Sequence, residues 1–152
     1  MLVQTLLQTA ARCGASPAVA DPSRSLTYRE LVGLSLVMRN HVSAATERPH
    51  VGILLPSTTA FVGTFYGTLW AGKTVVPLNF MLQPGEVAAV VQDAELDVVF
   101  ATKFFREVAA ALPCKVIFVE DLPIQEDLAK LAAAAASGAG QMPPPPKVTA
   151  DD

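Results

Sequence analysis

The chain has few charged residues and no surplus of positive ones. Lysine and arginine together number 11 against 14 aspartates and glutamates, and charged residues make up only 16% of the sequence. No segment collects basic side chains into the patch or stripe that binds a phosphate backbone. We therefore expect no nucleic-acid partner.

Cysteine and histidine are scarce too, with two residues of each. Cys13 and Cys114 stand far apart without CxxC spacing, so two free thiols in a reducing compartment are the plain interpretation, ahead of a disulfide or a metal site. His41 and His50 have no carboxylate or thiol at ligand spacing. The sequence also lacks a Ser–His–Asp or Cys–His set, so we expect no catalytic residue and no metal site.

The distribution of apolar and charged residues predicts neither a signal peptide nor a membrane-spanning helix. The N-terminal segment has no basic start, and its apolar residues suit a short amphipathic helix: Leu2, Leu6, Leu7 and Ala10. The longest uncharged run, Val51–Gly72, has the length of a span, but Pro56 and the hydroxyl residues after it interrupt the run. We expect no transmembrane segment and a cytoplasmic location.

Apolar residues, at 51% of the chain, are abundant and come in short blocks. Four blocks are typical of strands buried on both faces of a parallel sheet: Val51–Leu55, Thr74–Val76, Val98–Ala101 and Val116–Val119. Helical patterns alternate with them: Tyr28–Ala45 behind a Thr27–Glu30 capping box, Phe61–Trp70, a helix opening at Pro84, Phe104–Ala109 and Ile124–Ala136. This alternation predicts an α/β fold with a doubly wound, mainly parallel sheet and helices on both faces. A small N-terminal β-hairpin is expected from Ala18–Ala20 and Ser25–Thr27.

The segment Gly67–Thr74 reads GTLWAGKT and matches the phosphate-loop pattern G-x-x-x-x-G-K-[ST]. A phosphate loop needs a strand before the glycines and a helix after them. Here an apolar helical stripe from Phe61 to Trp70 runs into the motif, Gly72 stands where a helix C-cap belongs, and a strand follows. We therefore expect helix, glycine and strand, and no nucleotide site.

The other polar features allow two interpretations each. Ser57 and Thr58 follow a strand and open a helix, where anions bind, but capping is the favoured role. The acidic residues Glu120, Asp121, Glu126 and Asp127 are expected on a solvated face. Residues 137–152 have linker composition, and the four prolines Pro143–Pro146 serve either as a spacer or as a ligand for a proline-reading groove.

Several segments, taken in order, resemble a known family. They are LTYREL at Leu26–Leu31, VGILLPSTTAFVGTFYGTLWAGKTVVPLNF at Val51–Phe80, QPGEVAAVVQDAELDVVFAT at Gln83–Thr102 and KVIFVEDL at Lys115–Leu122. The sequences of these segments and their order are similar to the N-terminal part of AMP-forming acyl-CoA synthetases. These are the adenylate-forming ligases that include luciferases and peptide-synthetase adenylation domains. PLNF and the later segments look closest to fatty acyl-CoA or acyl-carrier-protein synthetases.

The resemblance implies residues 1–136 as the N-terminal α/β subdomain and residues 137–152 as the linker toward an ATP loop. The family's Thr-Thr-Gly…Pro-Lys-Gly loop does not occur in the sequence, nor do its later acidic and lysine residues. The expected role is therefore a scaffold, catalytically incompetent alone, of a ligase that uses ATP, magnesium and CoA or an acyl carrier protein. The resemblance points to the Asn79–Leu82 loop, with Asn79 and Phe80 as residues on the CoA side. Phe80 and Met81 stand where the family often has a small residue and arginine, which weakens any phosphate contact there.

Two other functions remain open at the sequence level. One is a free-standing, non-catalytic interaction module derived from the same subdomain. The other is an unrelated nucleotide-binding α/β domain, which ranks last because Pro56–Thr59 offers no glycine to a phosphate. The expected partners are the remainder of the parent ligase and a second copy of the chain in a homodimer that covers apolar surface. A parent peripheral at the inner membrane is compatible with the expected cytoplasmic location. The acid, its chain length and the acceptor are not encoded in this stretch.

Overall fold

The computed structural model describes residues 2–140 and 142–147. In chain order its elements are α1 (Leu2–Cys13), β1 (Pro17–Ala20), β2 (Ser25–Thr27), α2 (Tyr28–Ala45), β3 (His50–Leu54), α3 (Thr59–Trp70), β4 (Thr74–Pro77), α4 (Pro84–Asp93), β5 (Val98–Ala101), η1 (Lys103–Phe105), α5 (Arg106–Ala110), β6 (Lys115–Phe118), η2 (Val119–Asp121) and α6 (Ile124–Ala136). The order of helices and strands is the one that the sequence predicts.

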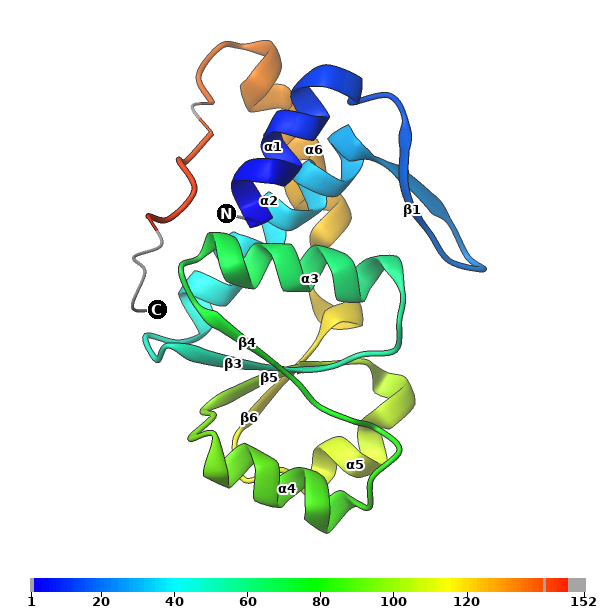
Figure 1. The fold of residues 1–152 in the computed structure, drawn as a ribbon, viewed down its shortest axis with the longest axis vertical. Helices are drawn as coiled ribbons and strands as arrows, with labels where there is room; N and C mark the ends of the chain where they lie inside the picture. Colours follow the sequence, from blue (N-terminus) through cyan, green and yellow to red (C-terminus); the bar gives the residue numbers. More distant parts are fainter. Residues whose placement is uncertain (1, 141, 148–152) are drawn as a thin grey trace.

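Four strands form one parallel sheet with the spatial order β4-β3-β5-β6. Figure 1 shows α1, α2, α3 and α6 on one side of this sheet and α4 and α5 on the other. Strands β1 and β2 pair antiparallel as a separate hairpin. The fold is therefore the α/β, doubly wound parallel arrangement with a small hairpin that we expected.

Alternate residues of each central strand fill two separate cores, because successive side chains of a strand point to opposite faces. Val98 and Phe100 of β5 pack with Leu34 and Met38 of α2. On the other face, residues of β3, β5, α4 and α5 pack together with three leucines from the segments that follow β4, α4 and α5: Leu54, Val87, Val91, Val99, Ala101 and Ala109, with Leu78, Leu96 and Leu112. The apolar residues of β3 and β5 are thus covered on both sides of the sheet.

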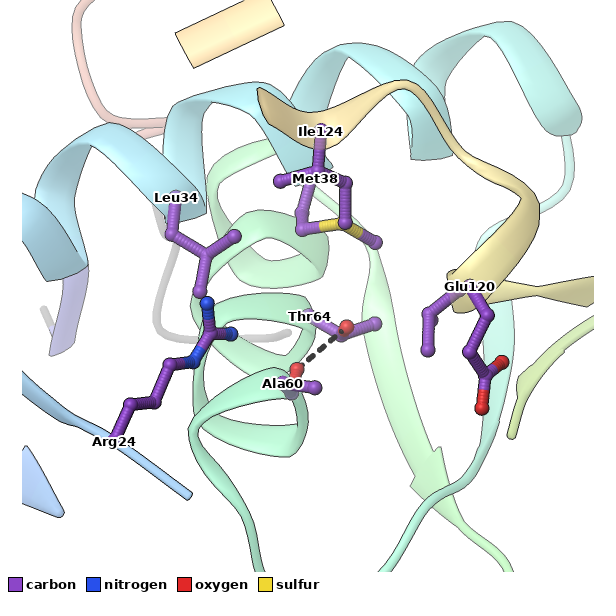
Figure 2. A pocket seen from close by; sticks show the side chains of 8 residues that line it. Arg24, Leu34, Met38, Ala60, Thr64, Glu120 and Ile124 are labelled. Carbon is purple, nitrogen blue, oxygen red and sulfur yellow. Dashed lines mark hydrogen bonds between the residues drawn. The ribbon is translucent and has the colours of Figure 1, made fainter. Parts of the chain in front are cut away.

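The closest helix pair, α2 and α3, depends on two glycines. A Cβ at Gly67 would lie 2.8 Å from both the Arg39 nitrogen and the Ser35 oxygen, and a Cβ at Gly63 would lie 2.5 Å from the Leu34 side chain. Figure 2 shows Leu34 of α2 pointing toward Ala60 and Thr64 of α3. The backbones of the two helices approach closely because these positions carry no side chain.

The predicted capping residues and starting residues of the helices are confirmed. Thr27 and Glu30 form the predicted capping box of α2, with the Thr27 N–H 2.7 Å from the Glu30 carboxylate. Gly72 has φ +74° directly after α3, and Pro84 begins α4. At the α4 start the Glu86 carboxylate accepts from the Gln83 N–H at 2.8 Å, although Gln83 is not a serine or threonine.

Some details differ from the sequence prediction. Leu2 is 54% exposed and Val3 takes its place in the core beside Leu6. Strand β3 ends before Leu55, and Val119 belongs to η2 instead of β6. The run Val51–Gly72 is divided between a strand, a loop and a helix, and within residues 2–140 and 142–147 no helix has the length and apolarity to cross a membrane.

Candidate functional site

The carboxyl ends of the four parallel strands form one edge of the sheet, which is where ligands bind in α/β folds. The chain moves from β3 to β4 on one side and then returns past β3 to β5, so the strand order reverses between β3 and β5. The loops at this edge are residues 55–58 after β3, 78–83 after β4, the turn at Thr102 after β5 and η2 after β6. These loops hold every candidate site residue that the sequence suggested at a strand end.

The N-terminus of α3, the first anion-binding candidate, is already occupied by a carboxylate. Thr58 caps the helix through its side-chain oxygen, as expected, with 3.5 Å to the Phe61 nitrogen. The Asp21 carboxylate from the hairpin turn accepts the Thr59 N–H at 2.8 Å, and Arg24 Nε donates to the Thr59 hydroxyl at 2.7 Å. The chain therefore supplies its own anion where a phosphate would bind.

Asp21 is held in its ionised form by hydrogen bonds. The Ser23 hydroxyl and the backbone N–H groups of Thr59 and Ser23 all donate to this carboxylate. These donors, the Ser23 hydroxyl first, hold the pKa of Asp21 far below its ordinary value. The sequence pattern indicated only a turn at Asp21–Arg24, and nothing local connects that turn with Thr59.

A small cavity lies next to this contact, between the hairpin, α2, α3 and the start of α6. Its volume is about 150 Å³, and it is lined by Leu34, Met38, Ala60, Thr64, Val119 and Ile124 together with Arg24 and Glu120. Figure 2 shows the Arg24 and Glu120 side chains on opposite sides of the cavity. The lining is apolar with one cationic and one anionic group, and its hydroxyl, on Thr64, donates to the Ala60 carbonyl oxygen at 2.8 Å.

The acidic residues after β6 tie two loops together. The Glu120 carboxylate accepts from the Thr102 hydroxyl and from the Lys103 backbone N–H, the latter at 3.1 Å. The Lys103 ammonium pairs with Asp121. The loops after β5 and β6 are therefore cross-linked, while Glu120, Asp121 and Glu126 are exposed to solvent as expected.

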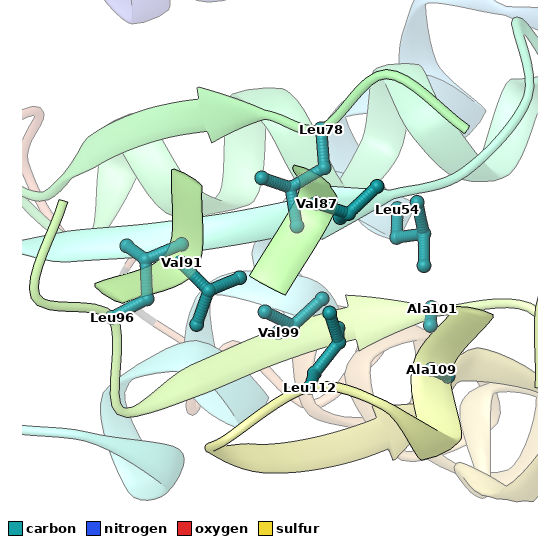
Figure 3. Packing of buried hydrophobic residues seen from close by; sticks show 9 residues of the cluster. All are labelled: Leu54, Leu78, Val87, Val91, Leu96, Val99, Ala101, Ala109 and Leu112. Carbon is teal, nitrogen blue, oxygen red and sulfur yellow. The ribbon is translucent and has the colours of Figure 1, made fainter. Parts of the chain in front are cut away.

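The Asn79–Leu82 loop extends β4 and then turns at the surface. The Asn79 side chain accepts the Met81 N–H at 3.0 Å, so its carbonyl oxygen shapes the turn. Phe80 stacks on Phe105 of η1 with the ring centroids 4.6 Å apart. Phe105 also packs against the core between α4, α5 and the sheet, whose residues Figure 3 shows.

Phe80 belongs to an exposed apolar patch that the sequence did not indicate. Phe80 is 39% exposed, Met81 81% and Phe104 84%, and Phe104 contacts Phe105 edge-on at 5.2 Å. We call Phe80, Met81, Phe104 and Phe105 the aromatic rim. It joins the loops after β4 and β5 across the intervening strand β3, which no sequence periodicity could reveal.

The phosphate-loop match falls on α3, Gly72 and the start of β4, as predicted. Lys73 turns to the Arg48 backbone and donates to its carbonyl oxygen at 2.8 Å. The segment has no strand before its glycines and no helix after them. It therefore lacks the geometry of a phosphate loop.

The histidines and cysteines have structural partners. His41 Nε2 lies 2.9 Å from the Asp127 carboxylate, and His50 Nδ1 lies 3.2 Å from the Ala94 carbonyl oxygen. Partial burial opposes ionisation of Asp127, but the hydrogen bonds from His41 and Lys130 bring its pKa below the ordinary value. The carboxylate partner of His41 lies 86 positions away along the chain, so a search for carboxylates at short sequence spacing from the histidine does not find it.

Both cysteines are free thiols, in agreement with the plain interpretation. Burial raises the pKa of the Cys114 thiol, and the Asp97 carboxylate adds to this effect, so the nucleophilic thiolate is disfavoured. In the part of the chain that the structure describes, no group of three or more His, Cys, Asp or Glu residues could hold a metal ion. The edge of the sheet thus presents exposed apolar and aromatic side chains.

Comparison with known proteins gives a family match over nearly the whole chain. The model of the family described as AMP-binding enzyme matches residues 6–152. Syringomycin synthase SyrB1 of Pseudomonas syringae pv. syringae is 34% identical over 84 residues, which are 54% of this chain and 14% of that protein.

Two solved structures have the same fold over most of the chain. The complex of VinN with 3-methylaspartate has a TM-score of 0.78 at 23% identity and covers 96% of this chain and 41% of VinN. A Mycobacterium tuberculosis fatty acyl CoA synthetase has a TM-score of 0.73 at 22% identity and covers 84% of this chain and 28% of the synthetase. The chain thus spans less than half the length of each of these proteins.

Proposed function

Because the chain belongs to the AMP-binding enzyme family, we propose that it is the scaffold part of an ATP-dependent, AMP-forming ligase that joins a carboxylic acid to CoA or an acyl carrier protein. The observation that carries the proposal is the family match over residues 6–152, with the fold similarity to VinN over 96% of the chain. The parent enzyme would use ATP and magnesium to make an acyl-adenylate. In this proposal the chain alone does not carry out that step.

The scaffold role is supported by hydrogen bonds within the chain that already use groups able to bind a phosphate. Asp21 occupies the N-terminus of α3, and Lys73 is bound to the Arg48 carbonyl oxygen. Transfer of a phosphoryl or adenylyl group needs positive groups and N–H donors directed at the phosphates. The Thr59 N–H at the carboxyl edge is thus already used by Asp21, and Lys73, which lies before β4 at the opposite edge, is used by Arg48.

We propose a fatty acid as the substrate class. The support is the sequence PLNF at Pro77–Phe80 and the similarity to a protein named as a fatty acyl CoA synthetase. The competing substrate class is an amino acid, since SyrB1 is a syringomycin synthase and VinN is seen with 3-methylaspartate. An acid panel in the assay below separates the two classes.

Pyrophosphate exchange tests the reaction. The chain and the full gene product, where the reading frame continues, are each incubated with ATP, magnesium, labelled pyrophosphate and a panel of fatty, aryl and amino acids. We expect exchange with fatty acids in the longer product and none in residues 1–152 alone. Exchange by the 152-residue chain would contradict the scaffold role, and exchange with amino acids alone would contradict the fatty-acid proposal.

Calorimetry tests nucleotide binding directly. Magnesium-ATP is titrated into the chain and into Lys73→Ala, with no binding expected in either. Micromolar binding that Lys73→Ala abolishes would show that Gly67–Thr74 is a nucleotide site after all.

We assign Asn79 and Phe80 to the side of the enzyme that receives CoA. The aromatic rim supports this, because exposed aromatic faces stack on the adenine of a nucleotide and Phe80 is already aligned by Phe105. In the full gene product Phe80→Ala should raise the KM for CoA roughly tenfold and leave the KM for ATP unchanged. Val90→Ala, an equally exposed apolar residue on α4, is the matched control and should change neither value.

The remaining assignments follow from this role. Residues 1–136 are the subdomain and residues 137–152 the link toward the ATP-binding part, with that part of the ligase as the main partner. We place the protein in the cytoplasm, with the parent peripheral to the inner membrane, and expect a homodimer of the isolated chain. The alternative, a non-catalytic interaction module, is favoured by the exposed aromatic rim and is tested by whether the reading frame continues.

A further inference from the structure

The four prolines near the C-terminal end lie against the helical layer. Trp70 Nε1 donates a hydrogen bond to the Pro143 carbonyl oxygen at 3.1 Å, between positions 73 residues apart. Figure 1 shows the segment leaving α6 and running along the outside of the molecule toward the level of β4. Trp70 itself is 2% exposed, and the partner of its buried indole N–H comes from this segment.

The segment forms one wall of a groove beside α1 and α3. A hollow of about 620 Å³ has Leu2, Phe65 and Leu69 among its walls, and Pro145 and Pro146 are also among its lining residues. A Cβ on Gly72 would lie 3.7 Å from the Pro146 Cβ, which is van der Waals distance. The segment therefore passes the end of α3, where Pro143, Pro145 and Pro146 are half-buried and the last two share the hollow with aliphatic and aromatic side chains of α1 and α3.

Proline is suited to such a groove for physical reasons. Its ring fixes φ, and each residue before a proline is restricted to extended backbone, so little conformational entropy is lost on docking. A proline has no N–H that would need a partner, while its carbonyl still accepts. Domains that recognise proline-rich segments use aromatic-lined grooves in the same way.

We propose that the groove between α1 and α3 is a polyproline-binding groove whose ligand is the chain's own Pro143–Pro146. The indole of Trp70 fixes the first proline, and the apolar walls take the later ones. The segment then acts as a strap that holds α1 on α3 and brings Lys147 beside the start of β4, where Lys73 and Thr74 line the same groove. Neither the spacer nor the external-ligand interpretation of the sequence includes this contact.

The indole proton of Trp70 provides a direct test, since it is the chain's single tryptophan. In nitrogen-15 NMR spectra of the full chain we expect one indole N–H signal that exchanges slowly with water. Replacing the prolines (Pro143→Gly, Pro144→Ser, Pro145→Gly, Pro146→Ser) keeps the carbonyl groups but removes the rings. Exchange of the indole proton should then become at least about tenfold faster. Met142→Ser, an exposed neighbour that keeps all four prolines, should leave the signal unchanged.

Unchanged amide signals of Val98–Ala101 in the same spectra establish that the four-residue variant is folded. An indole signal with wild-type position and exchange in that folded variant would overturn the proposal, because the prolines would then contribute nothing.

A peptide experiment tests the groove independently of the tether. Acetyl-Pro-Pro-Pro-Pro-Lys amide is added to the four-residue variant, with acetyl-Gly-Ser-Gly-Ser-Lys amide as the control. We expect the proline peptide alone to restore the wild-type indole signal, with a dissociation constant on the order of millimolar because the tether is lost. Equal effects of the two peptides, or no restoration at tens of millimolar, would contradict a proline-specific groove.

Discussion

At the scale of single residues, Asp21 shows how one side chain can both build and close a site. Its carboxylate joins the hairpin turn to α3 by accepting from Ser23 and Thr59. Because it lies at the positive end of the helix, it removes the strongest anion position at the sheet edge. A turn residue that looks ordinary in the sequence therefore decides what the edge can bind.

Asp21 should make stability depend on pH on the acid side. Its pKa in the folded state is depressed, so its contribution is complete above the ordinary value of about 4 and is lost as pH falls toward the folded value. Asp21→Asn should be less stable than wild type at pH 7, and the difference should shrink as the pH falls below about 4. Urea midpoints across this range measure it. Asp93→Asn, an exposed residue of α4, makes the same charge change and should show no such trend. Equal midpoints for Asp21→Asn and wild type at pH 7 would contradict this role.

Gly72 carries the conformational demand at the end of α3. With φ at +74°, a side chain with a β-branch is strained there even though a Cβ would make only an ordinary van der Waals contact with Pro146, at 3.7 Å. Gly72→Val should lower the free energy of unfolding by about 1–3 kcal/mol, and Gly72→Asn by less, because asparagine tolerates this region. Equal denaturation midpoints for both variants and wild type would refute the strain.

At the scale of elements, α3 shows what periodicity can and cannot predict. The apolar stripe from Phe61 to Leu69 correctly predicts a helix, but these residues are only half-buried. The deeply buried face is the one with Gly63, Thr64 and Gly67, which packs on α2. Small residues allow close backbone contact, so burial here follows size more than hydrophobicity.

A matched pair of glycines tests this packing. Gly67→Ala should lower the free energy of unfolding by roughly 1–3 kcal/mol, because the new methyl group meets backbone atoms of Ser35 and Arg39 that cannot move aside. Gly85→Ala in α4 meets nothing within 4 Å and should be neutral or stabilising by up to about 1 kcal/mol. Guanidinium unfolding of both variants gives the comparison. A loss no greater for Gly67 than for Gly85 would mean that the helices can separate without cost.

Local chemistry allowed most elements to be predicted, and distant contacts limited the prediction of the site. Ile124–Ala136 and Val98–Ala101 were predicted with the bounds that the structure has, since caps, prolines and apolar blocks act within a few residues. The contacts of Asp21 with Thr59 and Phe80 with Phe105 join separate elements. They depend on strand order, which a single sequence does not encode in its periodicity.

At the scale of the whole molecule, the apolar surface is not fully covered. The last helix, α6, packs on α2, and its Leu131 reaches the Trp70 cluster, but the aromatic rim lies on the opposite side of the sheet. Monomers seldom leave large contiguous apolar patches in water. In a larger ligase, the neighbouring part would be expected to cover the rim.

The isolated chain should therefore self-associate, most simply as a closed two-fold dimer. Sedimentation equilibrium over about a hundredfold concentration range measures this, with a mass above 16.0 kDa expected at the high end. Phe104→Ser, at a position 84% exposed, should weaken the association without changing the unfolding midpoint at low concentration. A single 16.0 kDa species at all concentrations would disprove the dimer.

The strand order also has a consequence for synthesis of the chain on the ribosome. Strand β3 lies in the interior of the sheet, yet its neighbour β5 is made only after α3, β4 and α4. At about 5–20 residues per second, the β3 edge stays unpaired for seconds while its apolar residues are exposed. The nascent chain is then open to edge-to-edge aggregation. Chaperone demand and codon-dependent pauses near β5 should consequently affect the yield of folded protein more than changes near α6.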